Sequence, residues 1–166
     1  MRLWQEMMKS PLGTVYLVTD ETYLYSLDFC GFEDRMHGLL RQRVGSYELM
    51  SRTRPSAAHR ALIAYFDGEL GAFNGVLRSL KGTEFQMSVW KELGNIAPGT
   101  TRSYQWVARR LGKPRAARAV GSANGRNPIA LAIPCHRVIG ASGALGGYAG
   151  GVDKKSWLLS HERKWA

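Results

Sequence analysis

One stretch, residues 129–140, most limits how this chain can fold, because an apolar run there ends in Pro-Cys-His-Arg. The run at residues 129–133 is typical of a buried strand. Pro134 favours an extended conformation at the preceding residue and has no N–H to donate to a strand ladder, so we expect regular pairing to stop there. The sequence therefore predicts a strand that ends by presenting Cys135.

Cys135 has two interpretations. An unpaired cysteine is most often a buried structural residue. A cysteine nucleophile instead needs a base for its proton and a positive charge that favours the thiolate, and His136 and Arg137 follow it directly. Because successive side chains on a strand point to opposite faces, we expect a water molecule rather than direct contact to connect Cys135 with His136.

The size and composition allow one domain or two small ones, since the chain has 166 residues and 45% hydrophobic content. No apolar run has the length of about 18 residues that predicts a membrane helix, and residues 1–9 lack the apolar core of a signal peptide. The two cysteines, Cys30 and Cys135, lie in no metal-ligand spacing, so we expect neither a disulfide framework nor a bound metal. These features predict a reduced, cytoplasmic protein with no membrane partner.

The net charge of +10 is distributed unevenly along the chain. Residues 1–82 carry 10 Lys and Arg against 9 Asp and Glu, whereas residues 83–166 carry 13 against 4. A one-sided basic excess of this kind indicates a polyanionic partner such as nucleic acid. A basic surface that is merely well solvated is the alternative.

The first half, which we delimit as residues 1–82, has the pattern of an α/β domain. Apolar and aromatic segments predict three strands, at residues 2–9, 14–19 and 23–29. Pro11 and Gly13 predict a turn between the first two. Helical spacing of apolar residues predicts two helices, at residues 33–44 and 56–67. The stretch 45–55 is polar and interrupted by Pro55, and the stretch 69–82, with its glycines, predicts a loop with a short strand.

The second half, residues 83–166, predicts a mainly helical domain. Thr83 and Gln86 have the spacing of a capping box, in which each side chain bonds the backbone N–H of the other residue. The helix that they start should end by Pro98. A last helix is predicted from residue 154 to about residue 161, capped by Asp153.

Two short helices lie between these elements. Ser103 should cap a helix over residues 104–111 that Gly112 closes. Pro114, at a first helical position, starts the next helix, whose body is residues 115–124. Two short helices joined by a Gly-containing turn, the second of them basic, are typical of a helix-turn-helix.

The second of these helices has almost no side-chain bulk. Its small residues are Ala116, Ala117, Ala119, Gly121 and Ala123. A major-groove recognition helix usually carries long polar side chains, whereas a helix of small residues can lie close along the narrower minor groove. Tight packing against another helix would produce the same composition. Arg115 and Arg118 favour the DNA interpretation, because packing faces rarely contain two guanidinium groups.

Several motifs, in this order, resemble the O6-alkylguanine-DNA alkyltransferase family. They are Ala116-Ala117-Arg118-Ala119-Val120-Gly121, Asn127-Pro128, Ile133-Pro134-Cys135-His136-Arg137-Val138, Gly147-Tyr148-Ala149-Gly150-Gly151 and Trp157-Leu158-Leu159-Ser160-His161-Glu162. The match is dense over residues 83–162 and looser before them, and the length resembles the short bacterial form. The resemblance implies a ribonuclease H-like α/β domain without ribonuclease chemistry. It also implies a mainly α, winged-helix-like second domain that carries the helix-turn-helix and the cysteine.

The resemblance also implies roles in the chemistry. Cys135 would take the alkyl group from O6 of guanine in a single, irreversible transfer that leaves a thioether. His136 would act as base through a water, Glu162 would orient His136, and Asn127 would brace this network. Tyr104 would contact the phosphate beside the lesion, help rotate the nucleotide out, and assist the departing guanine.

Further residues would bind the DNA and the base. Arg118 would fill the space that the extruded base leaves, while Arg115 and the small residues Ala116, Ala117, Ala119 and Gly121 would lie along the minor groove. Tyr148 would pack on the base, and the rest of the pocket would come from Pro134, Val138, Gly147, Ala149 and Gly150. The implied partner is double-stranded DNA with O6-alkylguanine, and O4-alkylthymine is a further candidate substrate. The resemblance implies no cofactor, and a monomer for which cooperative assembly on DNA stays open.

Two other functions agree with parts of the pattern. One is a non-catalytic helix-turn-helix regulator in which Cys135 is structural. The other is a cysteine hydrolase built on Cys135 and His136, although adjacent Cys and His residues form a poor dyad.

Overall fold

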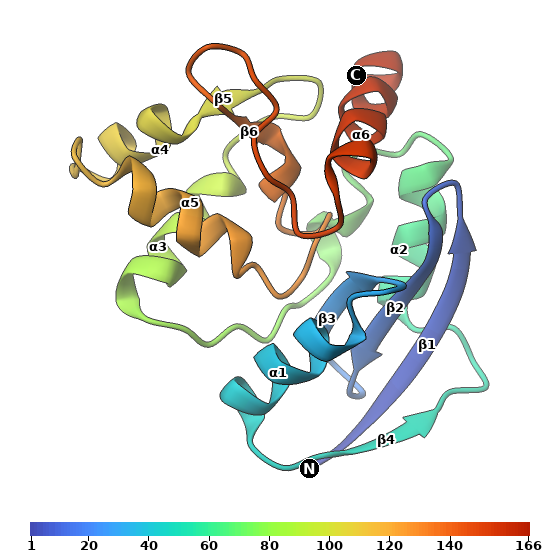
Figure 1. Ribbon diagram of the computed structural model, residues 1–166. Helices are drawn as coiled ribbons and strands as arrows, with labels where there is room; N and C mark the ends of the chain where they lie inside the picture. Colours follow the sequence, from blue (N-terminus) through green and yellow to red (C-terminus); the bar gives the residue numbers. More distant parts are fainter. The chain divides into compact units, whose positions relative to one another are not determined.

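The computed structural model describes all 166 residues, which fold into two compact units (Figure 1). The first unit comprises Met1–Lys81 together with Pro128–Ala132, and the second comprises Gly82–Asn127 and Ile133–Ala166. A short piece of the later chain, directly before the cysteine motif, thus folds with the first unit. None of the helices combines the length and apolar character that crossing a bilayer requires.

The first unit is built on a four-stranded mixed sheet. Its strands are β1 (Arg2–Ser10), β2 (Gly13–Thr19), β3 (Leu24–Phe29) and β4 (Glu48–Ser51). The order is β3-β2-β1-β4, with β4 parallel to β1 and the other pairs antiparallel. The three predicted strands are present. Strand β4 was not predicted in the polar stretch 45–55, because it lies at the sheet edge and its mostly exposed residues carry no apolar alternation.

Two helices complete the first unit, α1 (Glu33–Val44) and α2 (Ala57–Phe66), close to their predicted bounds. Met36 and Leu40 of α1 join Leu3, Val18 and Tyr25 of the sheet in one buried cluster. The Ser56 side chain caps α2 by accepting a hydrogen bond from the His59 backbone. Where a loop with a short strand was predicted, a 3₁₀ turn, η1 (Ala72–Gly75), and a single bridge from Arg78 to Leu24 occur instead.

The second unit contains four helices and one very short sheet. The helices are α3 (Glu84–Leu93), α4 (Tyr104–Arg110), α5 (Ala117–Gly125) and α6 (Val152–Trp165). Strands β5 (Arg102–Ser103) and β6 (Val138–Ile139) pair in parallel. Figure 1 shows α5 between α3 and α4, and the Trp90 indole N–H of α3 donates to the Ala123 carbonyl of α5 at 2.9 Å.

Local capping signals account for where α3 and α4 begin. Both halves of the capping box are present, since Gln86 N–H donates to the Thr83 side chain and Thr83 N–H donates to the Gln86 side chain. Ser103 accepts from the Trp106 N–H at the start of α4. These bonds satisfy backbone donors that the first turn of a helix leaves without an internal partner.

Two predicted helix starts are wrong. Helix α5 begins at Ala117, because a turn closed by the Ala116 N–H and the Lys113 carbonyl keeps Pro114 and Arg115 outside the helix. Helix α6 begins at Val152, after Gly151 with φ of 99°, a conformation that glycine adopts without steric cost. Asp153 therefore lies inside the first turn of α6. Its negative charge interacts favourably with the helix dipole there, but its side chain does not cap the helix.

The strand predicted at residues 129–133 is also wrong. Ile129 makes one isolated bridge to Leu27. Two tight turns follow, and each consists of three residues. The first turn is closed by Ala132 N–H on the Ala130 carbonyl and centred on Leu131, whose φ is 66°. The second, before Cys135, is centred on Pro134 with φ of −80° and ψ of 63°. Both are γ-turns, and the form with positive φ is strained.

Contacts within the first unit hold this strained segment. The Leu27 backbone donates to the Pro128 carbonyl at 3.2 Å and accepts from the Ala130 N–H at 3.1 Å. The guanidinium of Arg78 donates to the Ala132 carbonyl at 3.2 Å and to the Phe73 carbonyl at 3.1 Å. Since these bonds use the backbone groups that a longer ladder would need, the apolar run is buried without being a strand.

The strain at Leu131 can be measured by comparing Leu131→Gly with Leu131→Ala. Both variants remove the buried leucine side chain beyond Cβ, and alanine keeps only Cβ, but only glycine adopts φ of 66° without strain. We expect Leu131→Gly to unfold at a higher urea concentration than Leu131→Ala, with an advantage of about 1 kcal/mol. Equal stability of the two variants, or a more stable alanine variant, would show that the turn is unstrained.

Candidate active site

A cavity of about 270 Å³ within the second unit has Cys135 in its wall. Its lining residues come from α4, α5, the cysteine segment and the loop before α6: Tyr104, Gly121, Asn124, Gly125, Cys135, Gly147, Tyr148 and Ala149. Cys135 opens a short 3₁₀ turn, η2 (Cys135–Arg137), and is only 4% exposed. A reagent therefore meets the thiol by entering the cavity.

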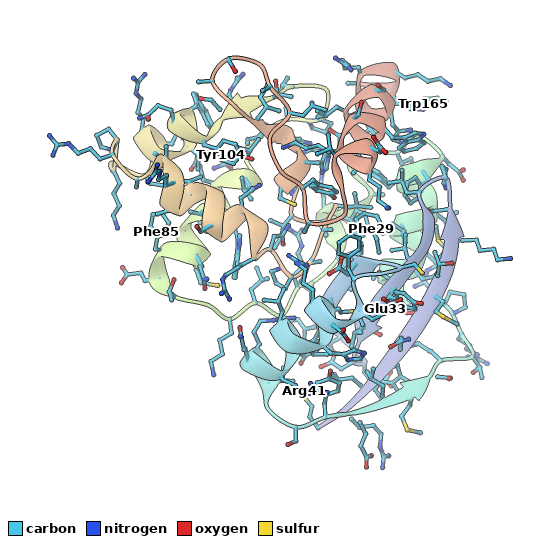
Figure 2. All side chains as sticks on the ribbon, viewed as in Figure 1. Phe29, Glu33, Arg41, Phe85, Tyr104 and Trp165 are labelled. Atoms are coloured by element: carbon cyan, nitrogen blue, oxygen red, sulfur yellow. The ribbon has the colours of Figure 1, made fainter.

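Small residues give the cavity its room. Gly121, Asn124 and Gly125 share one face of α5, because residues three and four positions apart are neighbours on a helix. Tyr104, labelled in Figure 2 at the start of α4, packs beside this face. A Cβ at Gly146 would lie 3.0 Å from the Tyr104 hydroxyl oxygen, and Gly146 has φ of 70°. The close approach and the backbone conformation both favour glycine at this position.

A buried trio of charged and polar side chains lies behind the cysteine. His136 Nε2 is 2.7 Å from Oε1 of Glu162, and both side chains are fully buried. Arg137 donates to the same carboxylate through Nε and Nη2, each at 2.8 Å, and through Nη1 to the Ile96 carbonyl at 2.7 Å. The two-pronged contact matches the planar guanidinium to the carboxylate.

These contacts set the charge states of the trio. Burial alone would raise the pKa of Glu162, but hydrogen bonds from His136 and Arg137 and the positive charge of Arg137 outweigh it and hold that pKa far below its usual range. Burial lowers the pKa of His136, and the neighbouring carboxylate offsets this only in part. At neutral pH the ion pair is therefore between Glu162 and Arg137, and His136 is neutral.

The neutral imidazole has a defined tautomer. Because an ionised carboxylate only accepts hydrogen bonds, His136 must carry its proton on Nε2. The Nδ1 atom then has a lone pair, and it is buried without a hydrogen-bond partner in the protein. The arrangement leaves a proton acceptor on the residue that follows Cys135, with its orientation set by Glu162.

Two amide side chains bracket the turn at Pro134. Asn127 Nδ2 donates to the Ile133 carbonyl at 2.8 Å, and Asn124 Nδ2 donates to the Cys135 carbonyl at 3.3 Å. Both amides are buried, so each bond also satisfies a backbone acceptor that water does not reach. The backbone on either side of the cysteine is thereby held in place.

Lys155 of α6 is a further buried cation near the site. Its Nζ donates to the Val138 carbonyl at 2.6 Å and to the Gly147 carbonyl at 3.3 Å. Burial lowers the pKa of Lys155 to about 8, and a negative charge on Cys135 acts in the opposite direction. The lysine thus connects β6 with the loop before α6 that forms part of the cavity wall.

The structure places the predicted site residues in three groups. Cys135, Tyr104, Gly121, Gly147, Tyr148 and Ala149 line the cavity. His136, Glu162 and Asn127 are buried behind it, whereas Pro134, Val138 and Gly150 are buried outside its lining. Arg115, Arg118 and Ala119 are exposed, and Ala116 and Ala117 are partly exposed.

Arg137 differs from its expected place. The sequence suggested a cation for the thiolate, but its guanidinium is bound to Glu162 and Ile96. Sequence reasoning also missed Asn124 and Lys155. The signal for Lys155 was present, because it shares the helical spacing of the buried residues Leu158, Leu159 and Glu162.

Comparisons with known proteins agree with the two-unit fold. Residues 3–78 match the family model described as "6-O-methylguanine DNA methyltransferase, ribonuclease-like domain". Residues 84–164 match "6-O-methylguanine DNA methyltransferase, DNA binding domain". Together the matches define a two-domain protein in which a mixed-sheet, ribonuclease-like domain precedes a helical DNA-binding domain.

Similar proteins cover nearly the whole chain. The methylated-DNA–protein-cysteine methyltransferase of Salmonella typhimurium is 44% identical over 165 residues, which are 98% of this chain and 96% of that protein. The protein of the same name from Methanosarcina barkeri is 44% identical over 160 residues, 96% and 97% of the two chains. Mycobacterium tuberculosis OGT, solved in complex with DNA, has a TM-score of 0.83 and 41% identity, covering 100% of this chain and 95% of its own. The chain belongs to the 6-O-methylguanine DNA methyltransferase family.

The charge states of the buried trio predict how stability changes with pH. An unfolded histidine binds a proton below about pH 6.5, whereas His136 in the folded protein resists it, so stability should fall on acidification through that range. Glu162 adds a second loss below the usual pKa of a glutamate, because its folded pKa is lowered too. Urea unfolding at about pH 7.5 and about pH 5.5 measures the first loss.

His136→Gln is the control variant, because its amide keeps a donor for Glu162 but does not titrate. We expect its stability to change less than that of the parent protein between the two pH values. An equal change in both proteins would assign the loss to other groups.

Proposed function

We propose that this chain is a methylated-DNA–protein-cysteine methyltransferase that repairs DNA by moving an alkyl group from O6 of guanine to Cys135. The observation that carries the proposal is a shielded thiol in a cavity wall, followed by a neutral imidazole whose Nδ1 has no protein partner. The names of the relatives and their similarity over almost the full chain support the same activity.

The proposed reaction is an in-line displacement at the alkyl carbon. His136 Nδ1 takes the thiol proton through a bridging water, and the Cys135 sulfur forms a bond to the carbon as the carbon–O6 bond breaks. The electron pair of that bond passes to the guanine, which would take a proton from the Tyr104 hydroxyl in the cavity wall. Tyr104 then recovers a proton from water, and His136 releases to water the proton that it gained. Glu162 stabilises the positive charge that His136 gains.

One molecule would repair one lesion. The product holds the alkyl group as a thioether, which has no acidic proton and no labile sulfur–sulfur bond for cellular thiols to exchange. Nothing in the reaction regenerates the thiol, so the protein is consumed.

The second unit would bind DNA electrostatically. Between Leu93 and Val152 the sequence contains eight Lys and Arg residues and no Asp or Glu. We infer that α4 and α5 act as a helix-turn-helix in a winged-helix-like domain, with the exposed side of α5 along the minor groove. Arg115, Arg118 and Ala119 on this side are exposed, while Val120 and Ala123 pack inward, which favours DNA contact over helix packing for the outer side.

The damaged nucleotide must leave the helix, because a thiol in a cavity cannot reach O6 inside a stacked base pair. Arg118 lies one turn before Gly121 on α5, and Gly121 lines the cavity. This proximity supports a role in which the Arg118 guanidinium fills the vacated stack. Tyr104 would act on the adjacent phosphate, and Tyr148 would pack on the base.

We also propose the remaining assignments that the sequence suggested. These are a domain division at residue 82, a ribonuclease H-like architecture for the first domain, cytoplasmic location, and a monomer that is able to assemble cooperatively on DNA. O4-alkylthymine would be a secondary substrate.

A mass spectrum tests the central proposal. After exposure to excess duplex containing O6-methylguanine, the protein should gain the mass of one methyl group, located on the peptide with Cys135. Cys135→Ala should gain nothing, and Cys30→Ala should react like the parent. Turnover of many lesions per molecule would contradict the proposal, as would sequence-selective DNA binding without a mass change, or hydrolysis of an ester.

The role of Arg118 is tested by separating extrusion from binding. We expect Arg118→Ala to slow single-turnover transfer by about tenfold or more, since unstacking costs a few kcal/mol and the variant no longer fills the gap. Its affinity for undamaged duplex should fall much less, because Arg118 is one of several basic residues whose charge attracts the DNA backbone. Equal losses in transfer rate and duplex affinity would count against the role in the stack.

A further inference from the structure

Asn124 is the one polar side chain of α5 in the cavity wall, and the two ends of its amide have different surroundings. The residue is 6% exposed, and its Nδ2 donates to the Cys135 carbonyl at 3.3 Å. Its Oδ1 is buried and has no hydrogen-bond partner in the protein. It shares the cavity with Cys135, Tyr104 and Tyr148.

The orientation of the amide follows from the chemistry of its neighbour. A backbone carbonyl only accepts hydrogen bonds, so the amide must turn Nδ2 toward Cys135. Exchanging the two ends would place two acceptors 3.3 Å apart. Oδ1 is therefore a fixed acceptor, and a buried acceptor without a protein partner favours a ligand that brings a hydrogen-bond donor.

We infer that Asn124 Oδ1 accepts a hydrogen bond from the exocyclic N2 amine of the extruded guanine. This inference rests on the proposed function and names a specificity-determining residue for it. Alkylation at O6 removes the proton from N1, so N1, N3 and N7 of the modified base all accept. The N2 amine is then the only donor that the base offers, and it is the only group of the base that an acceptor such as Oδ1 can bind.

The same contact would discriminate between substrates. O4-alkylthymine has no amine, and its N3 has lost its proton, so Oδ1 would remain without a partner when that base occupies the cavity. A site that provides a buried hydrogen-bonding group rejects an analogue that lacks the complementary group, because the site group is left unpaired. Asn124 thereby makes guanine the preferred lesion.

The test compares two bases in the same duplex, O6-methylguanine and O6-methylhypoxanthine, which lacks only the N2 amine. Single-turnover transfer rates are measured with the parent protein and with Asn124→Leu, which has a similar volume and no polar atom. We expect the parent to be slower on O6-methylhypoxanthine by about tenfold, or about 1.4 kcal/mol. We expect Asn124→Leu to be slow on O6-methylguanine and to treat the two bases nearly equally.

The ratio of the two rates separates recognition from positioning. Loss of the bond to the Cys135 carbonyl slows transfer from both bases by the same factor and leaves the ratio unchanged. Asn95→Leu, the same substitution at an exposed position of the second unit, should keep the parent ratio. If Asn124→Leu melts below the assay temperature, Asn124→Ala provides the same ratio.

Two results would overturn the inference. One is a parent protein that transfers equally fast from both bases, and the other is an Asn124 variant that keeps the parent ratio. Absence of transfer from O6-methylguanine itself, with Cys135 intact and the protein folded, would instead contradict the proposed function.

Discussion

The site depends on the hydrogen bonds that the Glu162 carboxylate accepts from His136 and from Arg137. Arg137 keeps the carboxylate ionised in a buried place, and the ionised carboxylate keeps the His136 proton on Nε2. Removing one partner of a buried ion pair typically costs about 3–5 kcal/mol, because the other charge is left uncompensated. The trio therefore stabilises the second unit and also determines which imidazole nitrogen is able to take a proton.

The backbone around Cys135 has a shape that neither a strand nor a helix provides. Two γ-turns lead into a single 3₁₀ turn, and the carbonyls on this path accept from Arg78, Asn127 and Asn124. Arg78 reaches the segment from a distant part of the chain, whereas Asn124 and Asn127 belong to α5 and the residues directly after it. Residues 128–132, directly before the cysteine motif, fold with the first unit, and the cavity residues all belong to the second.

The two sides of helix α5 have different surroundings. Val120 and Ala123 pack inward, whereas Gly121 and Asn124 line the cavity. The outer side carries Arg118 and small residues in contact with solvent. A bulky residue at Gly121 would fill the cavity from the same helix that we propose as the DNA-contacting element, so small side chains serve both the pocket and the close approach to a groove.

The sequence by itself determined the elements whose signals are local. The capping box of Thr83, the cap at Ser103 and the apolar spacing of α1 each act within a few residues, so their physical cause can be found in the sequence alone. The cysteine motif and the flanking motifs were sufficient to indicate the family. Only the tertiary structure decided that residues 129–133 are not a strand, that β4 joins a sheet edge, and that Asn124 enters the cavity. In each case the deciding hydrogen bonds either join distant parts of the sequence or close a turn. A local pattern of apolar residues carries no information about such bonds.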